Sequence, residues 1–383
     1  MTEPVALADL TTLRVGGVPA RMVAPETEQE LVETALEVWA SDDEWLLLGG
    51  GSNTVASDEG FDGTVIRVLT RGIAVTGPDE MTGPDRVRLR VQAGEPWDDV
   101  VAYAVAHGWS GTEALSGIPG SSGAAPVQNI GAYGQELSSS IVAIDFLDYD
   151  TGERRRMEAD ELGLGYRTSV LKQGLRGVVL AIELDLHDTT AEAAVLGSAL
   201  SRPVAYAQLA GALGVQLGDR VPITALRETV LALRASKGMA LDPSDPDTAS
   251  AGSFFTNPIV SERFSRELPE SAPRWIVGNE GERPDRVIPL HEYAGVVPVP
   301  GVESMRWVKL SAAWLIEHSG ITRGFRLPGS RAAVSSKHTL ALTNTGGATA
   351  AEIAELARYV QGRVAAEFGV ILQPEPVLVG LTL

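Results

Sequence analysis

The sequence has no cysteine, only five histidines and few basic residues relative to acidic ones. The absence of cysteine excludes disulfides, thiolate nucleophiles, iron–sulfur clusters and cysteine-ligated zinc. No two histidines have the spacing of a zinc-binding pair such as HExxH, so we expect no metal site. The five are His107, His187, His291, His318 and His338.

Lysine and arginine number 31 against 50 aspartates and glutamates, which gives a formal net charge of −19. Nucleic acids and anionic membranes bind proteins through clustered basic residues, so we expect neither as a partner. Apolar runs approaching the roughly 18 residues of a membrane helix are also missing. Residues 1–14 lack the basic-then-apolar order of a signal peptide. The sequence therefore predicts a soluble, cytoplasmic protein.

Length and composition predict a globular protein with more than one domain. The 383 residues correspond to two or three domains of roughly 150 residues each. Hydrophobic residues make up 44% and charged residues 21%, both ordinary values. The polar, proline-containing stretch at 242–248 is the best candidate for a domain boundary, and similar stretches at 77–86 and 280–286 predict surface loops.

Helices and strands are both expected, without a regular alternation between them. Capping boxes of Thr and Glu predict helices over 27–39 and 349–369. Pro96 at the start of one apolar stretch, and glycines that end all three, predict further helices over 96–108, 223–237 and 308–319. The class is therefore α+β. Short apolar runs predict strands at Trp45–Leu48, Thr64–Val68, Val87–Ala93, Ile141–Asp148, Val178–Leu186, Leu340–Leu342 and Val377–Val379.

The first glycine cluster follows an apolar strand directly. After Trp45–Leu48 the chain reads Gly49-Gly-Gly-Ser-Asn53. Consecutive backbone N–H groups in such a turn can form an anion-binding nest, for which a pyrophosphate is a natural occupant. Neither the Rossmann pattern GxGxxG nor the P-loop pattern can be read here. Phosphate binding and an ordinary tight turn both remain possible interpretations.

A second glycine-rich and almost uncharged segment covers 116–136. It reads Ser116-Gly-Ile-Pro-Gly-Ser-Ser-Gly-Ala-Ala-Pro126 and continues Val127-Gln-Asn-Ile-Gly-Ala-Tyr-Gly-Gln-Glu136. This many glycines and prolines exclude a regular helix or strand interior. The backbone packs either around a flat or phosphorylated ligand or on itself as an Ω-loop.

Together with four further motifs, these two segments resemble the UDP-N-acetylenolpyruvoylglucosamine reductase family, flavoenzymes of bacterial peptidoglycan precursor synthesis. The resemblance extends from about Leu7 to Gly380, with the motifs in the family's order and spacing. The four are Gly165-Tyr-Arg-Thr-Ser169, Ala251-Gly-Ser-Phe-Phe-Thr-Asn-Pro258, Ala312-Ala-Trp-Leu-Ile316 and Gln373-Pro-Glu375.

The resemblance implies a two-part FAD-binding domain of the vanillyl-alcohol-oxidase (PCMH) type, in residues 1–80 and 81–240. A substrate-binding α+β domain would follow in 241–383, with its last residues returning Glu375 to the active site. FAD would be bound non-covalently, because the chain has no cysteine and the motifs no histidine. The implied cofactor-binding residues are Gly49, Gly50, Gly51, Ser52, Asn53, Ser116, Gly117, Ile118, Gly120, Gly123, Ala124 and Ile182.

The implied reaction is the NADPH-dependent reduction of UDP-N-acetylglucosamine enolpyruvate to UDP-N-acetylmuramate. Hydride passes from FAD N5 to C3 of the enolpyruvyl group, and C2 is then protonated. Arg167 matches the family's catalytic arginine, whose planar fork suits a carboxylate that gains charge. Ser253 matches the proton donor, and Glu375 matches a third catalytic residue beside the enolpyruvyl group. The family usually has a β-branched residue after this glutamate, so Pro376 is a local departure.

The resemblance also implies residues that bind the nucleotide sugar. Arg234 and Lys237 share a helix face and would bind the diphosphate, although cations at a helix C-terminus also stabilise the helix itself. Tyr206 matches a tyrosine that one branch of the family carries on a loop closing over the nucleotide, which makes this chain the Tyr-loop type. Further implied substrate contacts are Tyr133, Asn257 and Lys309. We expect a monomer.

Two alternative functions remain open. The chain could be another FAD-dependent oxidoreductase of the same fold, which would not need Arg167, Ser253 and Glu375 together. It could also be a catalytically inactive flavin- or nucleotide-binding regulator, but no structural role demands those three residue types.

Overall fold

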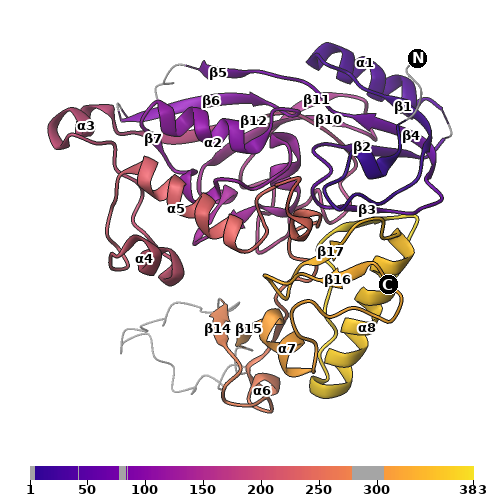
Figure 1. Ribbon diagram of the computed structural model, residues 1–383. Helices are drawn as coiled ribbons and strands as arrows, with labels where there is room; N and C mark the ends of the chain where they lie inside the picture. Colours follow the sequence, from indigo (N-terminus) through magenta and orange to yellow (C-terminus); the bar gives the residue numbers. More distant parts are fainter. Residues whose placement is uncertain (1–4, 42, 77–82, 84, 278–305) are drawn as a thin grey trace, which may run out of the picture.

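A computed structural model describes residues 5–41, 43–76, 83, 85–277 and 306–383 of the protein (Figure 1). The loop expected at 280–286 lies outside these residues, as do His291 and most of the loop expected at 77–86. Among the described helices, none combines the length and the apolar character that a membrane span requires.

The first subdomain is a small parallel sheet with one helix. Its strands are β1 (Pro19–Val23), β4 (Phe61–Arg67) and β2 (Trp45–Leu48), in the order β1-β4-β2. Helix α1 (Glu28–Trp39) begins with the expected capping box of Thr27 and Glu30. Its apolar face packs against residues of both β4 and the central strand of the next sheet, so α1 joins the first subdomain to the second.

The second subdomain is a six-stranded antiparallel sheet. The order is β11 (Arg154–Glu158), β10 (Ile141–Asp148), β12 (Gly177–Asp188), β6 (Arg86–Gln92) and β5 (Ile73–Thr76), and β7 (Trp109–Ser110) pairs with the end of β12. Helix α2 (Trp97–Ala106) covers one face of this sheet (Figure 1). Pro96 is the N-cap of α2 rather than its first residue. Strand β5 lies before residue 80 but pairs with this second sheet.

Three helices follow β12. The expected helix at 223–237 is confirmed as α5 (Ile223–Ser236). Helices α3 (Thr190–Leu196) and α4 (Ala207–Leu213) were not expected, because neither has a side-chain cap at its N-terminus that the sequence could reveal. Short 3-10 helices occur at Leu7–Asp9, Glu113–Leu115, Ser122–Gln128, Leu137–Ser139 and Pro246–Thr248, and a two-residue strand pair at Gly131–Ala132 (β8) and Gln135–Glu136 (β9).

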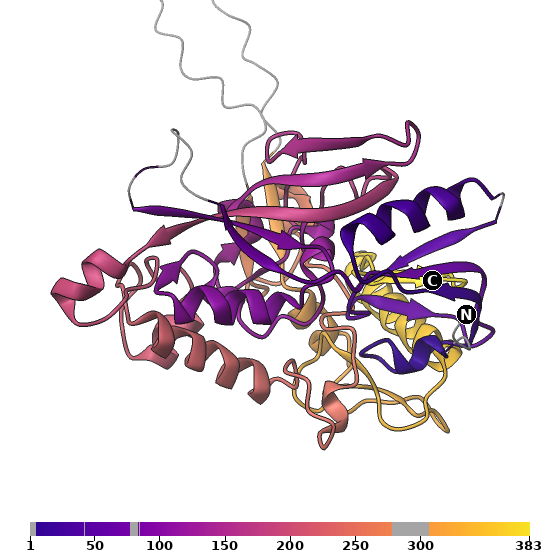
Figure 2. The ribbon, with the colours of Figure 1, turned by 90° about the horizontal axis from the view of Figure 1, so that it is seen from above.

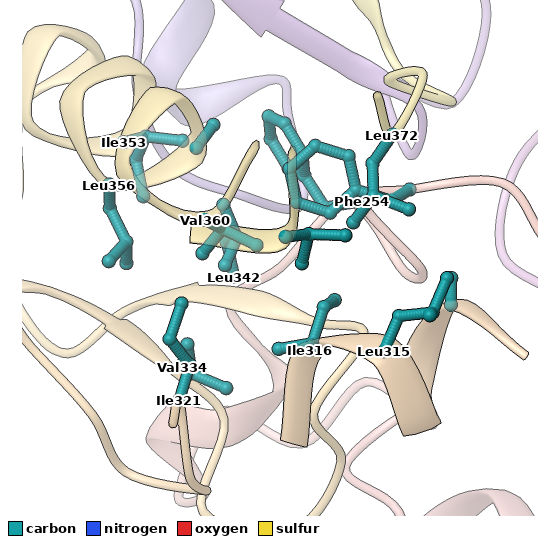
Figure 3. Packing of buried hydrophobic residues seen from close by; sticks show 14 of the residues in the cluster. Phe254, Leu315, Ile316, Ile321, Val334, Leu342, Ile353, Leu356, Val360 and Leu372 are labelled. Atoms are coloured by element: carbon teal, nitrogen blue, oxygen red, sulfur yellow. The ribbon is translucent and has the colours of Figure 1, made fainter. Parts of the chain in front are cut away.

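The C-terminal part packs its own core around a long helix, α8 (Ala350–Phe368), which begins with the expected capping box of Thr349 and Glu352. Side chains from α8, from α7 (Ala312–His318) and from the hairpin β16–β17 (Ala332–Val334 and Leu342–Asn344) enclose Phe254 (Figure 3). A second small sheet has the order β13 (Ile259–Ser261), β15 (Trp307–Leu310) and β14 (Arg274–Val277), with α6 (Glu262–Ser265) beside it.

Two expectations for this part were wrong in detail. The helix expected at 308–319 begins only at Ala312, because Val308 and Leu310 are buried alternately with half-buried neighbours, the pattern of a strand. Ser311 then caps the helix through the N–H of Trp314. The strand expected at Leu340–Leu342 begins at Leu342 instead, and the carbonyl of Leu340 accepts a hydrogen bond from Phe254.

The chain finally returns to the first subdomain. Strand β18 (Val377–Val379) pairs in parallel with β3 (Thr54–Ala56), directly after the first glycine cluster. Asp58 accepts hydrogen bonds from the N–H groups of Ala350 and Ala351 at the start of α8. Figure 2 shows the C-terminus beside the indigo strands of the first subdomain. These contacts fix the C-terminal part against the turn that carries the glycines.

Candidate active site

A cavity of about 700 Å³ lies where the two N-terminal subdomains meet the C-terminal part. The glycine turn, the 118–133 segment, the start of β12, the end of α5 and residues 250–253 all line it, together with Glu375. Its volume falls within the range of cavities that hold cofactors and drug-sized ligands. The motifs singled out in the sequence therefore converge on one site.

The glycine turn forms one wall because its backbone is in direct contact with the 118–133 segment. A Cβ at Gly50 would lie 2.7 Å from the Cα of Gly120, and Gly51 has a φ of +60°. No hydrogen bond within the described chain uses the backbone N–H groups of residues 50 to 53. These free donors in a left-handed turn fit the nest expected for a pyrophosphate.

The opposite wall of the nest comes from the 3-10 helix Ser122–Gln128. The Cβ of a residue at Gly123 would meet the Cβ of Ala93 at 2.6 Å, so only glycine lets this helix lie against the end of β6. The side of this segment that faces the cavity includes Ile118, Gly120, Gly123 and Ala124. The packing favours a segment folded around a ligand over an Ω-loop packed only on itself.

Three of the expected cofactor-binding residues do not line the cavity. Ser116 is fully buried and donates its hydroxyl to the carbonyl of Glu113. Gly117 lies behind the wall, with its N–H on Asp98. Ile182 belongs to the core under α2, and Val178 and Val179 of the same strand line the cavity instead.

Arg167 reaches the cavity from a tight hairpin that holds it in a strained backbone conformation. Its φ is +54°, a left-handed value that costs energy for a residue with a side chain. The guanidinium donates to the carbonyl of Gly131 at 2.8 Å, and its Nε lies 3.0 Å from Oε1 of Glu375. The side chain is therefore positioned before any ligand arrives.

Asn129, which supports this arginine, was not among the site residues expected from the sequence. Asn129 also has a left-handed φ, of +44°, and only 1% of its surface is exposed. Its Nδ2 donates to the carbonyl of Gly165 at 3.1 Å, and its Oδ1 accepts from the N–H of Ser138 at 2.9 Å. Asn129 thus ties the second glycine-rich segment to the hairpin that carries Arg167.

Glu375 is held by its backbone on both sides. Its N–H donates to the carbonyl of Phe254 at 2.9 Å, and its own carbonyl accepts from Asn53 Nδ2 at 3.3 Å. The side chain is 11% exposed, and burial raises the pKa of its carboxyl group against the opposing effect of Arg167 and Lys172. Lys172 is a cation near the site that the sequence did not indicate.

Ser253 lies on the same cavity, next to two anchored aromatic residues. Gly252 before it has a φ of +73° and makes the turn. Phe254 and Phe255 after it are each 1% exposed, and Phe254 lies deep in the C-terminal core (Figure 3). The three expected catalytic residues therefore come together on one cavity although they lie far apart in the sequence.

Four residues are expected to bind the nucleotide. One of them, Arg234, is buried and held by backbone carbonyls, whereas the other three are more accessible from the cavity. Arg234 is 8% exposed and donates to the carbonyls of Gly117 and Met239, each at 2.9 Å. Lys237 is less buried, and its Nζ donates to Gln208 at 2.8 Å. Tyr133 and Tyr206 pack edge to face beside it, with Lys237 Nζ 5.4 Å from the Tyr133 ring.

Asn257 and Lys309 lie on the far side of Arg167, beside a second cavity of about 790 Å³. Asn257 is among the residues that line this cavity, and Arg167 lines both cavities. Asn257 Oδ1 accepts the N–H of Ala312 at the start of α7, and Lys309 Nζ lies 4.7 Å from the ring of Tyr166. Burial raises the pKa of the Tyr166 hydroxyl.

His338 is another residue of the main cavity that the motifs did not include. Burial and the nearby charges of Lys237 and Arg323 lower its pKa to about 4. Its imidazole is therefore neutral at physiological pH and adds no positive charge to the lysine beside it.

Comparison with known proteins agrees with this geometry. Residues 243–379 match a family model described as the C-terminal domain of UDP-N-acetylenolpyruvoylglucosamine reductase, and residues 19–158 match an FAD binding domain. Proteins named UDP-N-acetylenolpyruvoylglucosamine reductase are similar to this chain over almost their whole length. That of Leifsonia xyli is 60% identical over 100% of both chains, and that of Saccharopolyspora erythraea is 47% identical over 99% of this chain and 95% of its own. The crystal structure of the Thermus caldophilus reductase is 25% identical with a TM-score of 0.60, covering 99% of both chains.

Proposed function

This chain belongs to the UDP-N-acetylenolpyruvoylglucosamine reductase family, and from that premise we propose which of its residues carry the reaction. It is an FAD-dependent oxidoreductase that reduces UDP-N-acetylglucosamine enolpyruvate to UDP-N-acetylmuramate with NADPH, a step of peptidoglycan precursor synthesis. The observation that carries the residue assignment is the meeting of Arg167, Ser253 and Glu375 on the cavity that the glycine turn lines.

The described residues fit FAD. The free N–H groups of residues 50 to 53 would hold its pyrophosphate, and Val178 and Val179 would lie along the flavin. When bound, FAD supplies the hydride chemistry, since reducing equivalents from NADPH reach C3 of the enolpyruvyl group through its N5.

Arg167 would bind the carboxylate of the enolpyruvyl group. Hydride addition at C3 moves negative charge into this carboxylate, and a fixed cation stabilises that charge without having to reorganise. The guanidinium is already held by the carbonyl of Gly131 and by Glu375. Because Glu375 is its ion-pair partner, the carboxylate of the substrate would share this guanidinium with it.

Ser253 would donate the proton to C2. A serine hydroxyl is a weak acid, but an enolate carbon is basic enough to take its proton. The anchored side chains of Phe254 and Phe255 keep the loop in place. Glu375 would lie beside the same group, where its ion pair with Arg167 helps to hold the guanidinium in place.

The proposal also covers the bounds of the domains, the oligomeric state of the protein and its location in the cell. We divide the chain at about 80 and 240, with residues 73–76 assigned to the second subdomain because β5 pairs there. A monomer is supported by the fact that all three reacting groups come from one chain. A cytoplasmic location is supported by the use of NADPH, a reductant of the cell interior.

The first test is the cofactor itself. The purified protein should be yellow, and denaturation should release the flavin into the supernatant because no covalent attachment holds it. Absorbance and chromatography of the released flavin measure this. Mixing the protein with NADPH and the enolpyruvyl nucleotide should then consume NADPH. Colourless protein that takes up no added FAD would contradict the cofactor assignment, and flavin without NADPH consumption would favour an inactive regulator.

The second test concerns the nucleotide end of the cavity. Lys237→Ala should raise the KM for the enolpyruvyl nucleotide about tenfold to a hundredfold, the effect of losing one charge-assisted hydrogen bond. The flavin spectrum should not change. Gln208→Ala is the matched control, because it removes the present partner of Lys237 and leaves the cation free for the nucleotide.

Arg234→Ala should behave differently from Lys237→Ala. Arg234 holds the carbonyls of Gly117 and Met239, so its loss should also loosen FAD. If Lys237→Ala leaves the KM of the nucleotide unchanged, the diphosphate binds elsewhere.

A further inference from the structure

The reaction brings two carboxylates to a single guanidinium. Glu375 already forms an ion pair with Arg167, whose Nε lies 3.0 Å from Oε1 of the glutamate, and the enolpyruvyl carboxylate would bind the same arginine. The two side chains are only 21% and 11% exposed, so water solvates their charges incompletely. Two carboxylates that share one cation in such a place are unfavourable unless a proton or a second cation balances them.

Lys172 is a cation in the right place to balance this charge. It lies shortly after Arg167 in the chain, and both residues line the second cavity. Gln373 and Pro374, the two residues before Glu375, line it as well. Arg167 and Lys172 are the cations that lower the pKa of Glu375 against the effect of its burial. The carboxylate of Glu375 therefore interacts with two positive charges, although only Arg167 contacts it.

The ammonium group of Lys172 is not engaged elsewhere within the described residues. Its side chain makes no hydrogen bond or ion pair there, and only its backbone N–H donates, to Ser169 Oγ at 3.2 Å. Lys337, by contrast, is paired with Asp245. A lysine without a partner of its own, beside a nearly buried ion pair, is available to balance an added negative charge.

The backbone holds Lys172 at a fixed place relative to the FAD cavity. Ser169 is fully buried, and its hydroxyl donates to the carbonyl of Val127 at 2.6 Å while it accepts the N–H of Lys172. Leu171 lines the main cavity and Lys172 the second one, so this turn forms part of the wall between the two. The lysine residue itself is exposed to solvent, which partly screens its charge.

We propose that Lys172 is a positioning residue that balances the charge of Glu375, so that the guanidinium of Arg167 can bind the carboxylate of the enolpyruvyl group. Lys172 would not touch the substrate, because the hydrogen bonds to this carboxylate come from Arg167. With Lys172 present, two cations face two carboxylates. This role rests on the proposed function, because it takes the enolpyruvyl nucleotide as the substrate.

A direct contact with a phosphate group is the alternative role for this lysine. Such a contact would strengthen the binding of every nucleotide ligand, whether or not the ligand has a carboxylate. Charge balance at Glu375 acts only on a ligand that brings a second carboxylate to Arg167. The two roles therefore differ in which ligands depend on Lys172.

The test compares two nucleotide sugars that differ in the carboxylate. The product, UDP-N-acetylmuramate, carries one, and UDP-N-acetylglucosamine lacks the lactyl group that bears it. Binding of each to the oxidised holoenzyme is followed by flavin absorbance at about pH 8.5, well above the usual pKa range of carboxyl groups. Lys172→Met should weaken binding of UDP-N-acetylmuramate about tenfold, the lower end of the effect of one charge on a neighbouring carboxylate. Binding of UDP-N-acetylglucosamine should stay as in the wild type.

Three further variants separate the charge of Lys172 from its shape and packing. Lys172→Arg keeps the charge and should bind both ligands as the wild type does, whereas Lys172→Gln should repeat the effect of Lys172→Met. Gln173→Leu is the matched control, because Gln173 belongs to the same turn and donates to Thr168 Oγ1 at 3.2 Å but lines neither cavity. It should change the binding of neither ligand.

Turnover provides a second measurement. Lys172→Met should raise the KM for the enolpyruvyl nucleotide about tenfold, for the same reason as in the binding experiment. Flavin reduction by NADPH should stay near the wild-type rate, because NADPH brings no carboxylate to Arg167. Stopped-flow absorbance of the flavin measures this step by itself.

Four results would overturn the role of Lys172. Equal weakening of both nucleotide sugars in Lys172→Met would show a direct contact with the nucleotide, and unchanged binding of both would show that Arg167 serves two carboxylates without help. A loss in Lys172→Arg as large as in Lys172→Met would show that charge is not what matters. Loss of FAD from Lys172→Met and Lys172→Gln would show a structural role. A wild-type holoenzyme that consumes no NADPH with the enolpyruvyl nucleotide would instead contradict the proposed function.

Discussion

Ser253→Ala should leave flavin reduction by NADPH near the wild-type rate and slow flavin reoxidation by the enolpyruvyl nucleotide at least about 10²- to 10⁴-fold. The range is that of a lost general acid. Only the second half-reaction needs a proton at C2, and hydride arrives at the flavin without help from this hydroxyl. Stopped-flow absorbance of the flavin measures the two half-reactions separately.

Two other variants make the Ser253 result specific. Ser253→Cys, a better acid of similar size, should recover part of the lost rate. Thr256→Val removes a hydroxyl from the same loop that does not line the main cavity, and should change neither half-reaction. If Ser253→Ala slows reduction as much as reoxidation, the residue supports the loop structure and the proton comes from another donor.

Arg167→Lys should slow reoxidation by the enolpyruvyl nucleotide about 10²- to 10³-fold, the cost of removing one preorganised donor from developing negative charge. Lysine keeps the charge but cannot reproduce a planar fork that contacts Gly131, Glu375 and a substrate carboxylate together. Flavin reduction by NADPH should change much less, because that step does not develop charge on this carboxylate.

The backbone at this position provides an internal control. A backbone φ of +54° costs arginine and lysine a similar strain energy. The thermal unfolding midpoint of Arg167→Lys should therefore stay near that of the wild type. Arg167→Gly relieves the strain and should be inactive without being less stable at this hairpin. Reoxidation by Arg167→Lys at the wild-type rate would show that charge alone suffices at this position.

Elements with local signals could be predicted from the sequence. The capping boxes at Thr27 and Thr349 predicted α1 and α8, and both are present with the reciprocal hydrogen bonds. Strands Trp45–Leu48, Ile141–Asp148 and Val377–Val379 have the predicted bounds. In each case the residues that decide the structure are close together in the sequence.

Features that depend on distant contacts could not be predicted in this way. The segment at 307–310 is a strand because β13 and β14 pair with it on either side, and those partners lie elsewhere in the chain. Asn129 and Lys172 acquire their places only when the hairpin at 165–168 meets the glycine-rich segment and Glu375. Motifs identify a wall of the cavity but not which side of it a residue faces, as Ser116 and Ile182 illustrate.

The contact between Asn53 and Glu375 also determines at what point of its synthesis the protein can begin to catalyse its reaction. The two residues are separated by 322 positions, and a ribosome adding about 5–20 residues per second takes roughly 15 to 65 s to make that stretch. The nascent chain thus carries the glycine turn long before it carries the glutamate, and the sheet of the second subdomain, whose last strand ends at Asp188, is also made before it. Cofactor loading can begin on the ribosome, whereas turnover of the nucleotide has to wait until the last strand has emerged and paired.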